Sequence, residues 1–313
     1  MKKFLLLNLI ILLMQLSCAK TINYSMLNEK NKESSHSLID LLDYKTVDTV
    51  DQFMNELQRI NNQGSADYAI IIKNDIFYSN ITFTGNIYKT IYLKGDSDFR
   101  TITNDNDFPL FTIYKSITLV LGENISLNGN NKNAPVVLVD GGRLELLDGS
   151  SIYGASDSGV IVGINNGPSF SGGVMVMNGG VIKNNSSESG GGVFVSPRAS
   201  FIMNNGTISG NKALSQEFGG GGVYISPGGR FVMNGGMITA NTSNNNGGGV
   251  YIIISGLFIK NGGVIDTLNK ADKNGNVAFY YSQSFSGLKK RDSTAGASQS
   301  MNSTLYSNDG GWE

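Results

Sequence analysis

Residues 220–225 have the sequence Gly-Gly-Gly-Val-Tyr-Ile, and this stretch decides the fold because close copies of it recur along the chain. Residues 190–195 (Gly-Gly-Gly-Val-Phe-Val) lie 30 positions earlier, and residues 247–252 (Gly-Gly-Gly-Val-Tyr-Ile) lie 27 positions later. The triplet glycines are Gly190, Gly191, Gly192, Gly220, Gly221, Gly222, Gly247, Gly248 and Gly249. A period of this length indicates structural units that stack on one another.

Two further motifs keep step with the triplets. An asparagine followed closely by glycine recurs at Asn178, Asn204, Asn234 and Asn261. An isoleucine follows each of them by four residues, and Asn185, Asn211 and Asn241 follow three residues later, where the last repeat has Leu268. Length varies only between this third motif and the next triplet, so we expect insertions at a single corner of the repeat.

Each period contains three short apolar runs bounded by glycine and asparagine. Val223–Ile225, the run ending at Met233 and the run around Ile238 are rich in β-branched and aromatic residues. Such runs are typical of strands, and none has room for a helix. The sequence therefore predicts an all-β fold: a single-stranded parallel β-helix with three short strands per coil. Weaker copies extend the solenoid over residues 65–282, which gives about eight coils.

The glycines and asparagines have a physical role in such a fold. Glycine allows the positive φ or the close backbone approach that a corner needs. Aligned asparagines can bond to the asparagine in the coil above and below. We therefore expect the column that contains Asn178, Asn204, Asn234 and Asn261 to be a structural ladder.

The repeat resembles the Gly-Gly-Ala/Phe-x-x-Asn repeats of polymorphic outer-membrane proteins and related bacterial β-helix surface proteins. Residues 208–213 (Ile-Ser-Gly-Asn-Lys-Ala), followed by Gly219–Tyr224, carry this likeness best. The chain departs from the family in having a third glycine where alanine is usual, and no membrane barrel is expected after the repeat. The resemblance implies a surface location and often adhesion.

The N-terminus has the pattern of an export signal. Lys2 and Lys3 precede a 13-residue apolar run, Phe4–Leu16, which is too short to span a bilayer. Cys18, the only cysteine, follows a small residue directly after this run and resembles a bacterial lipobox cysteine, although Gln15 stands where leucine is usual. The resemblance implies a signal peptide over residues 1–17 and lipid on Cys18. The alternative is cleavage after Ala19.

The ends of the chain are predicted to differ from the repeat. Residues 18–45 are expected to form a tether, and residues 46–64 a cap helix that begins with the capping box Thr49–Gln52 and ends at Gly64. Residues 283–313 are expected to be a C-terminal cap or loose tail, in which the basic triplet Lys289–Arg291 forms a solvated turn.

Chemistry-bearing residues do not converge in the predicted coils. The acids stand singly in their columns, and the sole histidine, His36, lies in the tether, so we expect no catalytic residues, no cofactor and no metal. The exception in sequence is Asp96, Asp98, Asp105 and Asp107, whose clustering leaves a calcium site as the alternative.

The sequence thus predicts a non-catalytic, lipid-anchored protein of the cell envelope, at the outer membrane or cell surface, that serves in display, adhesion or as an antigen. Its partners are the membrane, through the lipid, and a protein or glycan on the solenoid face. Phe194, Tyr224 and Tyr251 align in one outward column that either binds such a ligand or packs under a loop. Only 16% of residues are charged, with a net charge of −1, and this excludes nucleic acid as a partner. A glycan-active enzyme and a purely structural envelope component remain the alternatives.

Overall fold

The computed structural model divides the chain into two units, residues 1–43 and residues 44–313. It describes only the second, over residues 44–83, 87–166, 169–273, 275, 277–279, 289–291 and 298–300. The predicted signal peptide, Cys18, His36 and nearly all of the tether lie outside the described residues.

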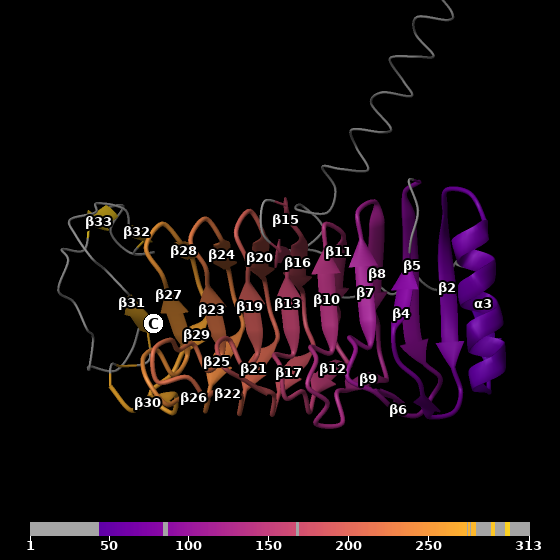
Figure 1. Ribbon diagram of the computed structural model, residues 1–313, viewed down its shortest axis with the longest axis horizontal. Coiled ribbons are helices and arrows are strands. Elements are labelled where there is room, and N and C mark those ends of the chain that lie inside the picture. The colour runs from indigo at the N-terminus through magenta and orange to yellow at the C-terminus, as the bar shows by residue number, and fades with distance from the viewer. Residues whose placement is uncertain are drawn as a thin grey trace, which may run out of the picture. The chain divides into compact units, whose positions relative to one another are not determined.

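The described part is a parallel β-helix whose eight coils each pass through three sheets (Figure 1). Sheet 1 contains β1 (Tyr44–Val47), β2 (Ala66–Ile72), β5 (Lys89–Gly95), β8 (Ile117–Leu121), β11 (Arg143–Leu146), β16 (Val174–Met177), β20 (Ser200–Met203), β24 (Arg230–Met233), β28 (Leu257–Lys260), β32 (Lys289–Arg291) and β33 (Ser298–Ser300). Sheet 2 contains β3 (Ile76–Phe77), β6 (Arg100–Thr103), β9 (Ile125–Asn128), β12 (Ser150–Tyr153), β17 (Val181–Lys183), β21 (Thr207–Ser209), β25 (Met237–Thr239) and β29 (Val264–Ile265). Sheet 3 contains β4 (Ile81–Phe83), β7 (Phe111–Tyr114), β10 (Val137–Asp140), β13 (Val160–Val162), β19 (Val193–Val195), β23 (Val223–Ile225), β27 (Val250–Ile252) and β31 (Val277–Phe279).

The register between coils is the one that the repeat predicts. Val193 pairs with Val223, and Val223 pairs with Val250, in parallel strands of sheet 3. Inside the coils, Phe201, Phe231 and Phe258 stack with ring centroids 4.6 and 5.0 Å apart. These spacings match the distance between neighbouring strands, so identical residues in successive coils build one continuous core.

A fourth, short sheet was not predicted. It runs along the corner between sheets 2 and 3 of the last four coils and contains β18 (Ser186–Ser187), β22 (Lys212–Ala213), β26 (Thr242–Ser243) and β30 (Lys270–Ala271). Its two-residue strands are mostly polar, so they lack the apolar run that marks the other strands.

The prediction that insertions occur at one corner only is wrong. An antiparallel hairpin, β14 (Ile164–Asn166) and β15 (Ser169–Ser171), is inserted between β13 and β16, at the corner between sheets 3 and 1. A corner faces outward, so an extra hairpin there leaves the stacking of the flanking strands intact.

The predicted cap helix is confirmed as α3 (Val50–Asn62), although it ends two residues before Gly64. Thr49 is its N-cap, and the Thr49 hydroxyl accepts a hydrogen bond from the Gln52 amide at 3.2 Å. The Gln52 side chain accepts from the Asp48 amide at 2.7 Å, one residue earlier than in the usual capping box. The apolar face of α3, which includes Phe53 and Ile60, is buried in the core.

The strands at the two ends of sheet 1 lie in segments that were predicted to be a tether and a solvated turn. β1, which begins inside the predicted tether, pairs with β2 in parallel. The basic triplet forms β32, a strand that pairs with β28 and with β33, so the prediction of a solvated turn is wrong.

Candidate functional site: an apolar stripe on sheet 3

The outer face of sheet 3 carries one apolar residue per coil over five successive coils. The strand register places Leu138, Ile161, Phe194, Tyr224 and Tyr251 in a single column. Each lies between two inward-facing residues of its strand, so its side chain points away from the core. We call this column, together with Phe218, the apolar stripe.

The aromatic part of the stripe is a stack of rings. The Phe194 and Tyr224 rings lie 4.7 Å apart and 18° from parallel, and the Tyr224 and Tyr251 rings lie 5.9 Å apart and 45° from parallel. Phe218, from the loop before β23, meets the Tyr224 ring edge-on at 6.3 Å. The rings stack along the axis of the solenoid, so their faces are covered by one another. The parts of these rings that are directed outward are therefore largely their edges.

Burial of the stripe increases toward the C-terminal coils. Tyr224 is 7% exposed and Tyr251 is 1% exposed, whereas Leu138, Ile161 and Phe194 are half-buried and Phe218 is 42% exposed. Burial raises the pKa of Tyr224 to about 12, with a smaller contribution from Tyr251. Of the two alternatives that the sequence left open, packing under a loop therefore describes Tyr224, which Phe218 contacts, and Tyr251 is buried beside Tyr224. The accessible part of the stripe is Leu138, Ile161, Phe194 and Phe218.

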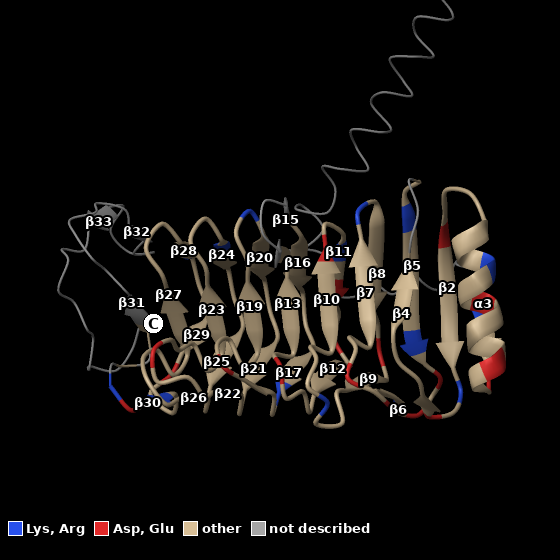
Figure 2. Ribbon diagram, viewed as in Figure 1, with Lys and Arg blue, Asp and Glu red and all other residues tan. Residues whose placement is uncertain are grey.

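Sequence reasoning missed Leu138, Ile161 and Phe218. The first two lie in the weaker repeats, where only the register against Phe194 shows that they continue its column. Figure 2 shows that the ribbon of sheet 3 in these coils is largely free of charged residues.

The outer asparagine column is a ladder, as predicted. The side-chain amides of Asn204, Asn234 and Asn261 each donate to the side-chain oxygen of the asparagine in the preceding coil, at 2.8, 2.8 and 2.7 Å. Because the amides bond to one another, this column is structural.

A second ladder lies inside the corner between sheets 2 and 3. The Asn211 amide donates to Asn241 at 2.9 Å and to the Ile182 carbonyl at 3.0 Å, while the Asn211 side-chain oxygen accepts from Asn185. Asn241 donates to Asn269 of the last coil, so Asn269 continues this column and the assignment of Leu268 to it is wrong. One extra residue in that coil moves the asparagine on by one place.

Geometry requires glycine at the first position of each triplet and at the third position of the triplets at 190–192 and 220–222. Gly190, Gly220 and Gly247 have φ of 65, 76 and 61°, in the left-handed region that favours glycine. A Cβ on Gly192 would lie 2.6 Å from the carbonyl oxygen of Gly222 in the next coil. The triplets therefore set the close stacking of the coils.

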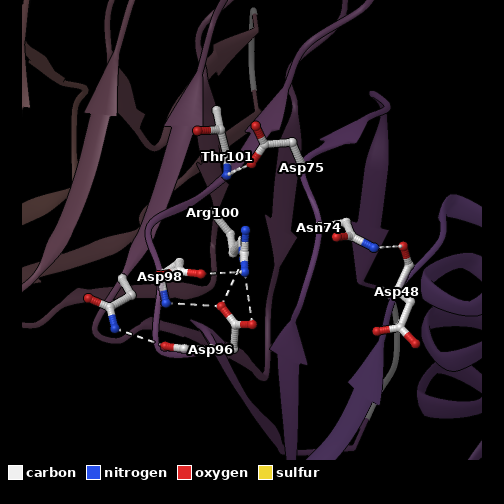
Figure 3. A network of polar contacts seen from close by, with 8 residues as sticks. Asp48, Asn74, Asp75, Asp96, Asp98, Arg100 and Thr101 are labelled. Atoms are coloured by element: carbon white, nitrogen blue, oxygen red, sulfur yellow. Dashed lines mark hydrogen bonds and ion pairs between the residues drawn. The ribbon is translucent and has the colours of Figure 1, made fainter.

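The clustered aspartates bind protein groups and separate into two corners, one before β6 and one after it. Figure 3 shows the first corner, with Asp96 and Asp98 beside Arg100. Arg100 donates to Asp96 at 2.8 and 2.9 Å and to Asp98 at 3.0 Å, and this hydrogen bonding lowers the pKa of Asp96. Asp105 accepts from the Ser79 hydroxyl, and Asp107 accepts from the Asn133 amide. Within the described ranges no three His, Cys, Asp or Glu side chains gather as a metal site requires, so the calcium alternative has no geometry to support it.

Comparison of the chain with protein-family models, with curated proteins and with solved structures gave no match. Among the described residues no helix combines the length and the apolar character needed to cross a bilayer.

Proposed function

We propose that the chain is an exported, lipid-anchored protein of the cell envelope whose β-helix displays the apolar stripe for adhesion to a protein partner. The lipid anchor rests on Cys18 and the export signal that precedes it. The adhesive role rests on the stripe, which is a continuous outward column of apolar side chains along a regular solenoid.

The ring geometry favours a protein over a glycan as the ligand. A sugar ring packs on the open face of an aromatic ring, whereas the Phe194 and Tyr224 faces stack on each other. Half-buried Leu138, Ile161 and Phe194 instead offer side-chain edges and methyl groups, which suit the apolar side chains of a protein surface.

The test is intact-mass analysis of the membrane fraction for the wild type and for Cys18→Ala, followed by protease shaving of whole cells. We expect an N-terminal peptide that begins at acylated Cys18, absent from the variant, and a body that shaving removes. An unmodified peptide that begins at Lys20 would rule out the lipid anchor.

Adhesion is tested with the same cells on protein-coated and polysaccharide-coated surfaces. Ile161→Ser and Phe218→Ser are expected to reduce attachment to protein, while Thr207→Ser on sheet 2 leaves attachment unchanged. Equal attachment by all variants would rule out the stripe as the adhesive surface.

A further inference from the structure

At the N-terminal end of the solenoid, sheets 2 and 3 each end at an edge strand that no other described strand extends, β3 and β4. Sheet 1 is extended past the first coil by β1. At the edge of sheet 3, the Asn61 side-chain amide of α3 donates to the Thr82 carbonyl of β4 at 3.1 Å. No described strand pairs with β3 on its N-terminal side, so β3 is the edge strand of sheet 2. An unpaired edge is a template for another extended chain.

Three exposed phenylalanines belong to the first two coils at this end. Phe77, on β3 itself, is 63% exposed, Phe99 is 68% exposed and Phe108 is 58% exposed. Phe99 directly precedes β6 and Phe108 follows β6 by five residues, so these two flank sheet 2 at its opposite corners in the second coil. In the later coils the outward residues of sheet 2 are mostly serine, threonine and asparagine, with Met237 and Val264 as exposed apolar residues, and none of them is phenylalanine.

The same surface is acidic. Residues 73–76 and 96–108, which border sheet 2 in the first two coils, contain five aspartates, one lysine and one arginine. Each exposed phenylalanine lies within two residues of an exposed aspartate: Asp75, Asp98 or Asp107. A carboxylate beside an aromatic ring suits a lysine or arginine, which can form an ion pair with the first and a cation–π contact with the second.

We propose that the β3 edge, with Phe77 on it and Phe99 and Phe108 at the corners of the next coil, binds an extended, basic segment of a partner protein by strand addition. The backbone of the segment pairs with β3, and alternate side chains contact Phe77 and the neighbouring aspartates. This surface lies on sheet 2 and is independent of the stripe on sheet 3 and of the lipid on Cys18.

The test is fluorescence anisotropy of labelled eight-residue peptides titrated with the full chain. The probes are a peptide of alternating lysine and valine, one of alternating glutamate and valine, and one of alternating lysine and proline, which cannot donate backbone hydrogen bonds at every second residue. We expect the lysine–valine peptide to bind at least about tenfold more tightly than the other two, with binding weakened by salt.

Two variants locate the binding. Phe77→Ser is expected to weaken binding of the lysine–valine peptide about tenfold or more, as loss of an aromatic anchor does. Met237→Ser is the matched control, because Met237 is 42% exposed on the same sheet in a distant coil, and it is expected to leave binding unchanged. Both replaced side chains are exposed, so folding is not at risk.

Three results would overturn the proposal. The first is no binding of the lysine–valine peptide up to about 1 mM, and the second is binding that Phe77→Ser leaves unaltered. The third is concentration-dependent self-association, measured by sedimentation, that Phe77→Ser abolishes, because the occupant of the edge would then be a second copy of this chain.

Discussion

At the scale of single residues, the polar repeats of the sequence are hydrogen-bonded to one another inside the protein. Asn211 is fully buried, and every polar atom of its side chain has a partner in the coil before or after it. A buried amide that loses its partners costs far more than an exposed one. The conspicuous asparagines are thus part of what holds the coils in register.

Asn211→Ala is expected to lower the free energy of unfolding by about 2–4 kcal/mol, because the partners Asn185 and Asn241 lose bonds while remaining buried. Urea unfolding followed by circular dichroism measures the change. Asn205→Ala, at an exposed position in the same coil, is the control and is expected to cost less than about 0.5 kcal/mol. Equal losses in the two variants would contradict a structural role for the ladder.

Tyr224 gives the folded protein a dependence on alkaline pH. Its pKa is raised to about 12 by burial, so the folded state holds the phenol proton more tightly than the unfolded state does. The resulting stabilisation is complete below pH of about 10, the ordinary pKa of tyrosine, and is lost as the pH rises toward 12. The free energy of unfolding should therefore fall more steeply between pH of about 10 and 12 in the wild type than in Tyr224→Phe. Parallel profiles would show that Tyr224 ionises as freely in the folded protein as in the unfolded chain.

At the scale of elements, both ends of the cap helix α3 are stabilised by hydrogen bonds with side chains. Thr49 caps its N-terminus, and the buried Lys89 ammonium donates to the carbonyls of Ile60 and Asn61 at 2.6 and 2.9 Å near its C-terminus. A cation at this position satisfies free carbonyls and interacts favourably with the helix dipole.

Lys89→Met is expected to destabilise α3 locally, by about 1.5–3 kcal/mol for the lost charged hydrogen bonds. Hydrogen exchange read by mass spectrometry should show faster exchange of α3 amides, while amides of β20 to β27 keep their rates because solenoid coils contact only their neighbours. Lys73→Met, at an exposed lysine, should change neither region. Faster exchange throughout the solenoid would show that the helix is not a separate cap.

The strands that could be predicted from the sequence are those whose apolar run recurs with the period. Val223–Ile225 and its equivalents can be recognised in the sequence because inward valine and isoleucine fill the same place in successive coils. The strands of the fourth, short sheet, such as Lys212–Ala213, carry no such run, and the hairpin at Ile164 has no counterpart in the described parts of the other coils. The open β3 edge was also beyond prediction, because it depends on what α3 and β1 leave uncovered.

The candidate site was predictable only in part, for a related reason. Phe194, Tyr224 and Tyr251 align by sequence, but whether an outward ring is open depends on loops such as the one that carries Phe218. Loop placement follows from tertiary packing and leaves no periodic signal. The accessible part of the stripe, at Leu138 and Ile161, therefore emerged only from the register of the strands.

At the scale of the described unit, the coils behave as interchangeable layers. Ladders of asparagine, phenylalanine and glycine run from coil to coil. Each coil thereby makes hydrogen bonds, ring contacts and close backbone contacts with the coil before it. In such an architecture stability is approximately a sum over coils and their interfaces. The solenoid serves as a regular support, on which the stripe of sheet 3 and the edge of sheet 2 are separate surfaces.

The most direct test of this account removes one whole coil. Deleting residues 193–222 joins Gly192 to Val223, which already occupies the equivalent place one coil later. We expect a soluble protein, one coil shorter, with a β-rich circular dichroism spectrum and cooperative urea unfolding. Deleting residues 193–207 is the control. It removes fewer residues, but it joins Gly192, which precedes a strand of sheet 3, to Ile208 in a strand of sheet 2. We therefore expect this variant not to fold. A whole-coil deletion that unfolds, or a control that folds equally well, would contradict the register on which the account rests.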